Sequence, residues 1–158
     1  MTPIEFIAVA LIAYSSSGAG SGRGRTASES NGVEHVYYLP FDFETYTAVT
    51  RENIRKRGAD VRLRLGNRSG ELAKLIRRSA PARGFDFSRV RLGIDFSSGP
   101  PAYVDKLGDV IIDGRRSKLS AADFTNVKRL IKRDWYMEFL AEKDRKRRSR
   151  HPKGPGGG

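Results

Sequence analysis

The sequence has no cysteine and only two histidines, His35 and His151. Without cysteine the chain has no disulfide, no thiolate nucleophile and no zinc site built on sulfur ligands. One histidine in the central part of the chain and one near its end do not make the multi-histidine cluster of a typical metal site. We therefore predict no metal site, no other cofactor and no catalytic centre built on cysteine or histidine.

Long hydrophobic runs are also lacking. A helix that spans a bilayer takes about 20 apolar residues, and the apolar stretch at the start, Ile4–Tyr14, is shorter than that. Its length is that of the hydrophobic part of a signal peptide. We therefore expect no integral membrane span and a signal-like leader over residues 1–14.

A Ser/Gly-rich segment, residues 15–32, follows the leader and is predicted to be a flexible linker. The run LIAYSSSGAG (residues 11–20) resembles a lipoprotein leader, in which a Leu-x-Ala-Cys box precedes a Ser/Gly tether. Tyr14 stands where the lipidated cysteine would be, so lipidation there is excluded. The resemblance implies a periplasmic, secreted or membrane-tethered protein rather than a cytoplasmic one. A buried N-terminal helix or strand and a wrongly assigned start codon are the alternatives.

Apolar side chains are sufficient for a core, since 38% of the residues are hydrophobic and 9% aromatic. We predict a single α+β domain over residues 33–142, with a small antiparallel or mixed sheet of five to six short strands packed against two short helices and a longer C-terminal helix. Alternating apolar and polar residues predict strands at 33–43, 61–65, 90–95, 102–105, 109–113 and 115–119. Helical spacing predicts helices at 50–57 and 71–78 and one that Ser120 caps and that runs past Phe139.

In the first predicted strand, residues 33, 35, 37, 39, 41 and 43 share one face, and we expect that face to point into the core. His35 and Tyr37 would then be buried. Tyr37, Tyr38 and Tyr103 are near this sheet but fall mostly at core spacing, so a base-stacking platform of the kind that binds single-stranded nucleic acid is only a minor alternative.

Basic residues are in excess, with 30 Lys and Arg against 18 Asp and Glu and a net charge of +12. The last 18 residues hold seven Lys or Arg and two acids, and the first 32 residues are neutral overall. Residues 33–140 therefore carry a net +7, so the domain is basic as well as the tail. Such a chain is expected to meet an anionic partner.

Two groups of residues are candidates for anion binding. Arg62 and Arg64 lie on one predicted strand and Arg89 and Arg91 on another, all opposite the core; if the strands are neighbours, four guanidinium groups share a sheet face. Asp60 and other acids interleaved with them would instead leave a mixed, solvated face. The second group belongs to a predicted disordered basic tail, residues 143–158: Lys143, Arg145, Lys146, Arg147, Arg148 and Arg150. Its alternative role is that of a solubilising tail.

The leading hypothesis is a small non-catalytic binding protein, exported or held at the envelope, whose partner is an acidic protein or an anionic envelope polymer. A cytoplasmic nucleic-acid-binding protein uses the same basic residues and is the first alternative. The second is a hydrolase that works with paired carboxylates. Its candidate residues are Asp42, Glu44, Asp86 and Asp95.

Overall fold

The structure is a computed structural model, and it describes residues 32–150. The predicted leader, all but the last residue of the predicted linker, and residues 151–158 lie outside the described residues. Among residues 32–150, no helix is both long and apolar enough to cross a membrane.

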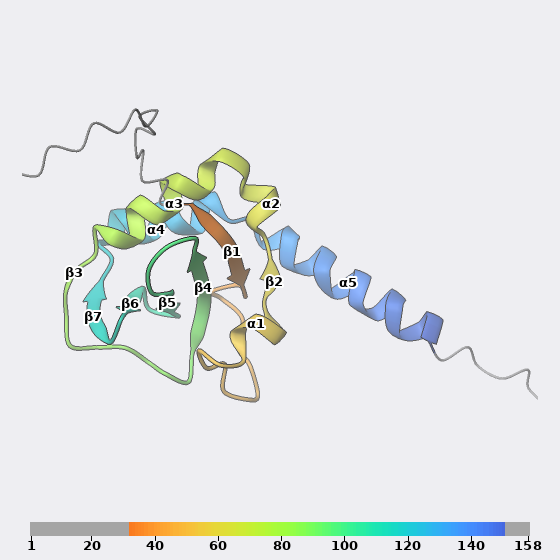
Figure 1. Cartoon of the computed structure of the whole chain (residues 1–158). Helices are drawn as coiled ribbons and strands as arrows, with labels where there is room; N and C mark the ends of the chain where they lie inside the picture. Colours follow the sequence, from red (N-terminus) through yellow and green to blue (C-terminus); the bar gives the residue numbers. More distant parts are fainter. Residues whose placement is uncertain (1–31, 151–158) are drawn as a thin grey trace, which may run out of the picture.

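One antiparallel sheet forms the centre of the domain (Figure 1). Its strand order is β2-β1-β4-β5-β6-β7-β3, and every pair of neighbours is antiparallel. The strands are β1 (Val33–Tyr38), β2 (Ala59–Asp60), β3 (Ala80–Pro81), β4 (Val90–Phe96), β5 (Ala102–Asp105), β6 (Asp109–Ile112) and β7 (Arg115–Lys118). The predicted α+β class is confirmed, with seven strands in place of five or six.

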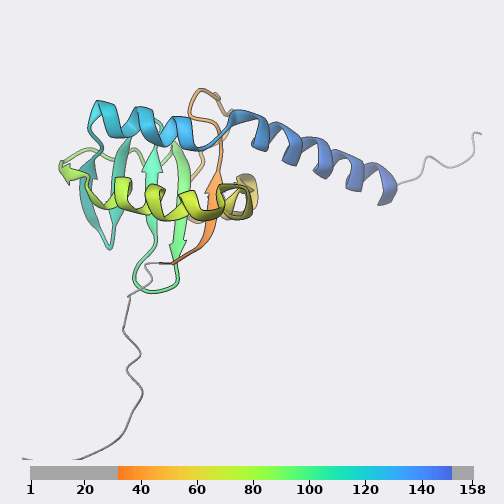
Figure 2. The same ribbon diagram turned by 90° about the horizontal axis from the view of Figure 1, so that it is seen from above.

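The helices lie mainly on one side of this sheet. They are α1 (Ile54–Arg57), α2 (Arg62–Leu65), α3 (Ser69–Arg77), α4 (Ala121–Leu130) and α5 (Arg133–Arg150), with a 3-10 turn at Gly66–Arg68. Figure 2 shows α3 and α4 side by side on one face, and α5 running on past the edge of the sheet. We call the face away from α3 and α4 the open face.

The core lies between the sheet and the pair α3 and α4. Leu92 and Ile94 of β4 are fully buried, as is Val104 of the neighbouring β5. From the helical side, Leu72 and Ile76 of α3 are fully buried against them, at the four-residue spacing that places two side chains on one helix face. Most of the apolar core lies in this layer, and the side chains that alternate with it along the strands point to the open face, where Ile54 and Ile111 are also buried.

The prediction for the first strand was correct that Val33, Leu39 and Phe41 are buried but wrong for His35 and Tyr37. Val36 and Tyr38 are in the core, whereas His35 is exposed and Tyr37 is only partly buried. The pairing of β1 with β4 shifts register between Val33 and His35. A strand alternates strictly, so a shift of one residue transfers every later side chain to the other face.

The predicted strand over residues 61–65 was also wrong, because this segment contains helix α2. Val61 and Leu65 are buried and Leu63 is 91% exposed. An i, i+4 pair of buried residues fits a helical turn, while a strand would bury all three. In five residues the two periods overlap, and the local sequence does not distinguish them.

The last predicted helix is two helices. Ser120 caps α4 as expected, since its hydroxyl accepts a hydrogen bond from the Asp123 amide at 3.0 Å. The chain then becomes extended at Ile131, and α5 continues to Arg150, beyond the tail start at Lys143 where we expected order to end. An ion pair between Glu142 and Lys146, at i and i+4, supports the helix there. Basic residues in the final turn also favour the negative end of the helix dipole.

Candidate anion-binding groove

A groove of about 660 Å³ lies between α5 on one side and α1, β1 and β2 on the other. We call it the α5 groove. Six residues of α5 line the groove, and successive members of this set are one or three positions apart in the sequence, which places them along one helix face. They are Phe139, Glu142, Lys143, Lys146, Arg147 and Arg150.

The opposite wall is formed where α1 packs against the sheet. It contains Arg55 and Lys56 of α1, Asp60 of β2 and Tyr37 of β1. Gly58 joins these elements, and a Cβ there would lie only 3.0 Å from the Ile54 carbonyl oxygen and the Tyr38 amide nitrogen. The absence of a side chain at Gly58 therefore lets α1 approach β1 closely, which brings the two α1 cations to the groove.

The groove is strongly positive, with six Lys or Arg against two acids. Arg55 is paired with Asp95 at 2.7 Å and Lys146 with Glu142 at 2.6 Å. The described residues include no ion-pair partner for Lys56, Arg147 or Arg150.

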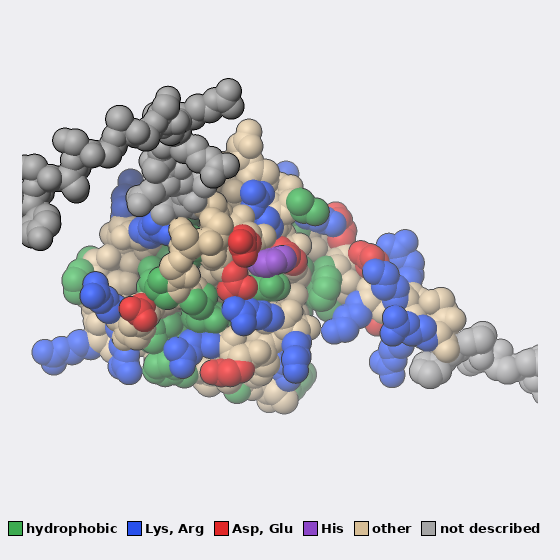
Figure 3. Space-filling view, viewed as in Figure 1, with side chains coloured by type: hydrophobic (Ala, Val, Ile, Leu, Met, Phe, Trp, Pro, Cys, Tyr) green, Lys and Arg blue, Asp and Glu red, His purple; other side chains and the backbone are tan. Residues whose placement is uncertain are grey.

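Like charges on both walls repel each other across the groove, and an anion between them would remove that repulsion. Figure 3 shows Lys and Arg gathered over the projecting end of α5, with few acidic side chains among them. The hydrogen bond from Lys146 lowers the pKa of Glu142, so this carboxylate stays ionised and neutralises one cation only. The arrangement is chemically suited to holding a ligand with several negative charges.

Four of the six predicted tail residues line this groove: Lys143, Lys146, Arg147 and Arg150. Arg145 and Arg148 belong to the same helix but do not line it. The tail prediction therefore identified one wall. The wall from α1 was missed, although residues 51–57 include four Lys or Arg, because the sequence does not show which distant segment will pack beside them.

Arg62 and Arg64 do not lie on the sheet, because both belong to α2. The Arg62 side chain donates a hydrogen bond to the Val33 carbonyl, and Arg64 is paired with Glu138 of α5. The predicted cluster of four guanidinium groups on one sheet face is therefore absent from the described part of the chain. The predicted cluster depended on a strand at residues 61–65, and this segment contains helix α2 instead.

Arg91 lies in β4 and Arg89 directly precedes this strand, as predicted, but the two side chains differ in exposure. Arg89 pairs with Asp86 at 3.4 Å on the surface. Arg91 is only 1% exposed and donates a hydrogen bond to the Phe43 carbonyl at 2.9 Å, while its Nε has no partner. Burial lowers the pKa of Arg91. A large ligand in solvent has no access to this guanidinium group, so it holds the Phe43 loop against the sheet.

The carboxylates considered for hydrolysis each contact a different basic residue. Asp42 is paired with Arg133 at 2.9 Å, Glu44 with Lys106, Asp86 with Arg89, and Asp95 with Arg55. Within residues 32–150, no group of three or more His, Asp or Glu side chains is placed to hold a metal ion.

His35 forms an ion pair at 2.6 Å with Asp60, which lines the groove. The hydrogen bond to Asp60 raises the pKa of His35, and the nearby Asp95 and Glu34 add to the effect. A raised folded-state pKa means that the pair stabilises the fold fully below the unfolded pKa of about 6.5. This contribution is lost as the pH rises through the folded pKa. Above it, the negative charge of Asp60 is no longer balanced by His35 and opposes an anion in the groove.

We expect the His35 ring protons to titrate by NMR with a midpoint above about 6.5. Asp60→Asn should return the midpoint towards that value, because it removes the charged hydrogen-bond acceptor. His35→Gln identifies the signal against that of His151. A midpoint at or below the ordinary value in the unchanged protein would show that the pair does not form in solution.

Searches of protein-family models, curated proteins and solved structures found no match to this chain.

Proposed function

We propose that this chain is a small, basic, non-catalytic binding protein and that it holds an anionic macromolecule in the α5 groove. One observation carries the proposal: two separate parts of the fold place six cations around one groove that contains only two acids. Lys56, Arg147 and Arg150 have no described carboxylate as partner, so their charge is available to a ligand.

The size of the groove favours a polymer over a small ion. A volume of about 660 Å³ is far more than one phosphate or carboxylate fills, and the cations follow α5 for about two turns. A chain of regularly spaced negative charges can contact them in succession. Export through the predicted leader remains part of the hypothesis, since residues 1–14 lie outside the described residues.

The test measures direct binding of two fluorescently labelled polyanions, inorganic polyphosphate and polyglutamate. Fluorescence anisotropy reports the affinity over a range of salt concentrations. We expect binding at low salt and a linear fall of log affinity with log salt, because each contact releases condensed counterions. The measurement uses the unchanged protein. Failure of both polymers to bind near 50 mM salt, a condition at which such contacts are strong, or an affinity that does not change with salt, would overturn the proposal.

A further inference from the structure

One row of side chains crosses the open face of the sheet. Strand pairing sets residues directly opposite each other from one strand to the next, and directly paired residues point to the same face. The row runs over six strands as Asp60, Tyr37, Gly93, Tyr103, Ile111 and Arg116. The two tyrosines in it are only partly buried.

Helix α1 covers the middle of this row. Gly93 separates the two tyrosines, and a Cβ on it would lie 3.2 Å from the Cγ2 atom of Ile54 in α1. Tyr37 therefore lies on one side of α1, in the α5 groove, and Tyr103 lies on the other side. Arg55 of α1 lines the space on both sides.

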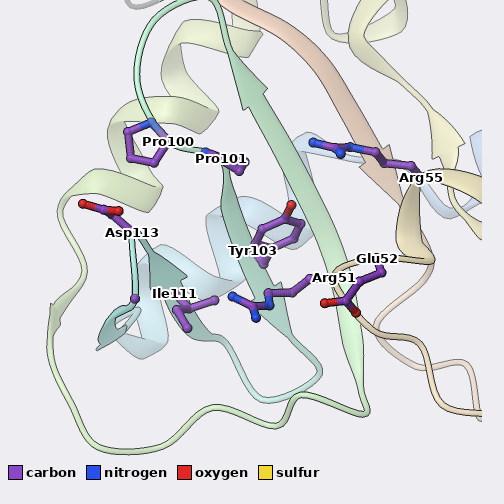
Figure 4. Close-up of a pocket in the computed structure, with 9 residues that line it drawn as sticks. Arg51, Glu52, Arg55, Pro100, Pro101, Tyr103, Ile111 and Asp113 are labelled. Atoms are coloured by element: carbon purple, nitrogen blue, oxygen red, sulfur yellow. The ribbon is translucent and has the colours of Figure 1, made fainter.

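The space around Tyr103 is a second hollow, of about 390 Å³, which we call the Tyr103 hollow (Figure 4). In Figure 4 the Tyr103 ring lies between Arg51 and Arg55, with Pro101 above it. Arg51 also packs against the ring of Phe87, 5.4 Å from its centroid, which restrains its guanidinium group. Two carboxylates, Glu52 and Asp113, also line this hollow, and Arg55 is paired with Asp95, so the hollow is balanced in charge and offers chiefly an aromatic ring to a ligand.

We propose that the anionic polymer is a single-stranded nucleic acid, with one base against Tyr103, another against Tyr37, and the intervening backbone on Arg55. This inference rests on the proposed function and adds the class of ligand. Proteins that bind single strands combine a positive groove with aromatic side chains on which bases stack. Here each hollow contains one partly buried tyrosine ring, of which the Tyr37 ring is also stacked on His35, and Arg55 lines both hollows.

The spacing of the two tyrosines favours unpaired bases over a duplex. They are two strands apart, which is about 10 Å between their backbones, whereas neighbouring bases in a stacked strand are about 3.4 Å apart. Bases that reach both rings must therefore be splayed on either side of α1, as in recognition of unstacked nucleotides. An acidic polypeptide satisfies the cations equally well but gains nothing from the aromatic faces.

The experiment compares two oligonucleotides of equal length and charge, an oligothymidylate of about 12 nucleotides and its abasic counterpart, which covers a typical single-strand site. We expect the unchanged protein to bind the oligothymidylate at least about tenfold more tightly, because stacking stabilises each bound base by about 1 kcal/mol or more. A duplex of the same length and polyglutamate are measured beside them.

Tyr103→Leu should reduce affinity for the oligothymidylate about tenfold and leave affinity for the abasic strand unchanged. Tyr103→Phe keeps the ring and should retain the affinity of the unchanged protein. If Tyr103→Leu also loses the abasic strand, the variant is not folded; Tyr37→Leu then takes its place.

The possible outcomes separate this inference from the proposed function. Equal binding of the oligothymidylate and the abasic strand would overturn base recognition while binding of a polyanion stands. Tighter binding of the duplex or of polyglutamate would likewise assign the groove to another class of partner. If no polymer binds, the proposed function itself fails.

Discussion

Replacing Lys143, Arg147 and Arg150 together by glutamine should weaken polyanion binding about 100-fold at low salt. These residues line one wall of the α5 groove and have no ion pair with a described carboxylate. If each contact with the ligand is worth about 1 kcal/mol, three of them amount to about two factors of ten. The slope of log affinity against log salt should also fall by about 2, since a contact with a single strand contributes about 0.7.

A matched control tests whether position or total charge matters. Lys132→Gln, Arg145→Gln and Arg148→Gln remove the same number of Lys and Arg, at or near α5, but none of these residues lines the groove. We expect this control to change affinity no more than about threefold through the loss of net charge. Circular dichroism of both variants shows whether α5 is intact. Equal losses of polyanion affinity in the two triple variants would mean that total positive charge decides binding and that the groove has no special role.

Gly108→Ala should be the most destabilising single substitution among the turns of the sheet, by about 2–5 kcal/mol. Gly108 has φ of +82°, a conformation that costs an L-residue with a side chain about 1–2 kcal/mol. An added Cβ would also lie 3.0 Å from the Phe124 ring of α4, so the residue is held against a helix as well as in a turn. Overpacking of this kind costs a further 1–3 kcal/mol or so.

Gly114→Ala distinguishes the cost of the positive φ from the cost of overpacking against Phe124. Gly114 has φ of +75°, but nothing lies within 4 Å of the position its Cβ would take. It should therefore lose only about 1 kcal/mol, for the backbone alone. Urea unfolding measures both free energies of unfolding. Phe124→Leu should be combined with each alanine substitution in turn. It should recover part of the free energy of unfolding lost by Gly108→Ala and none of that lost by Gly114→Ala. Equal losses for the two alanine variants would show that Phe124 moves aside freely.

The fold was predictable where alternation is strict and the turns are marked. The strand from Val90 and the meander that Gly108 and Gly114 divide appear where they were predicted. Each of these strands pairs with a neighbour close in sequence, so local pattern and tertiary structure agree. Segments with mixed periods were less predictable, because tertiary packing decided between helix and strand at residues 61–65.

The candidate site was predictable only in part. The cations of α5 follow from the sequence, since a run of basic residues is visible without knowing the fold. Arg55 and Lys56 were missed because their approach to α5 depends on contacts across more than 80 residues. The exposure of Tyr37 was missed because a register shift between paired strands leaves no mark on the sequence of one strand.

Helix α5 has one more consequence, which concerns how quickly a ligand is found. The helix is about 27 Å long. Its first turns pack on the domain through Tyr136 and Phe139, and its later turns continue past the edge of the sheet as an arm (Figure 2). Positive charge on such an arm attracts a diffusing polymer from a wider volume of solution than the same charge on a compact surface, and it orients the first encounter. Shortening α5 would therefore slow capture in addition to removing cations that line the groove.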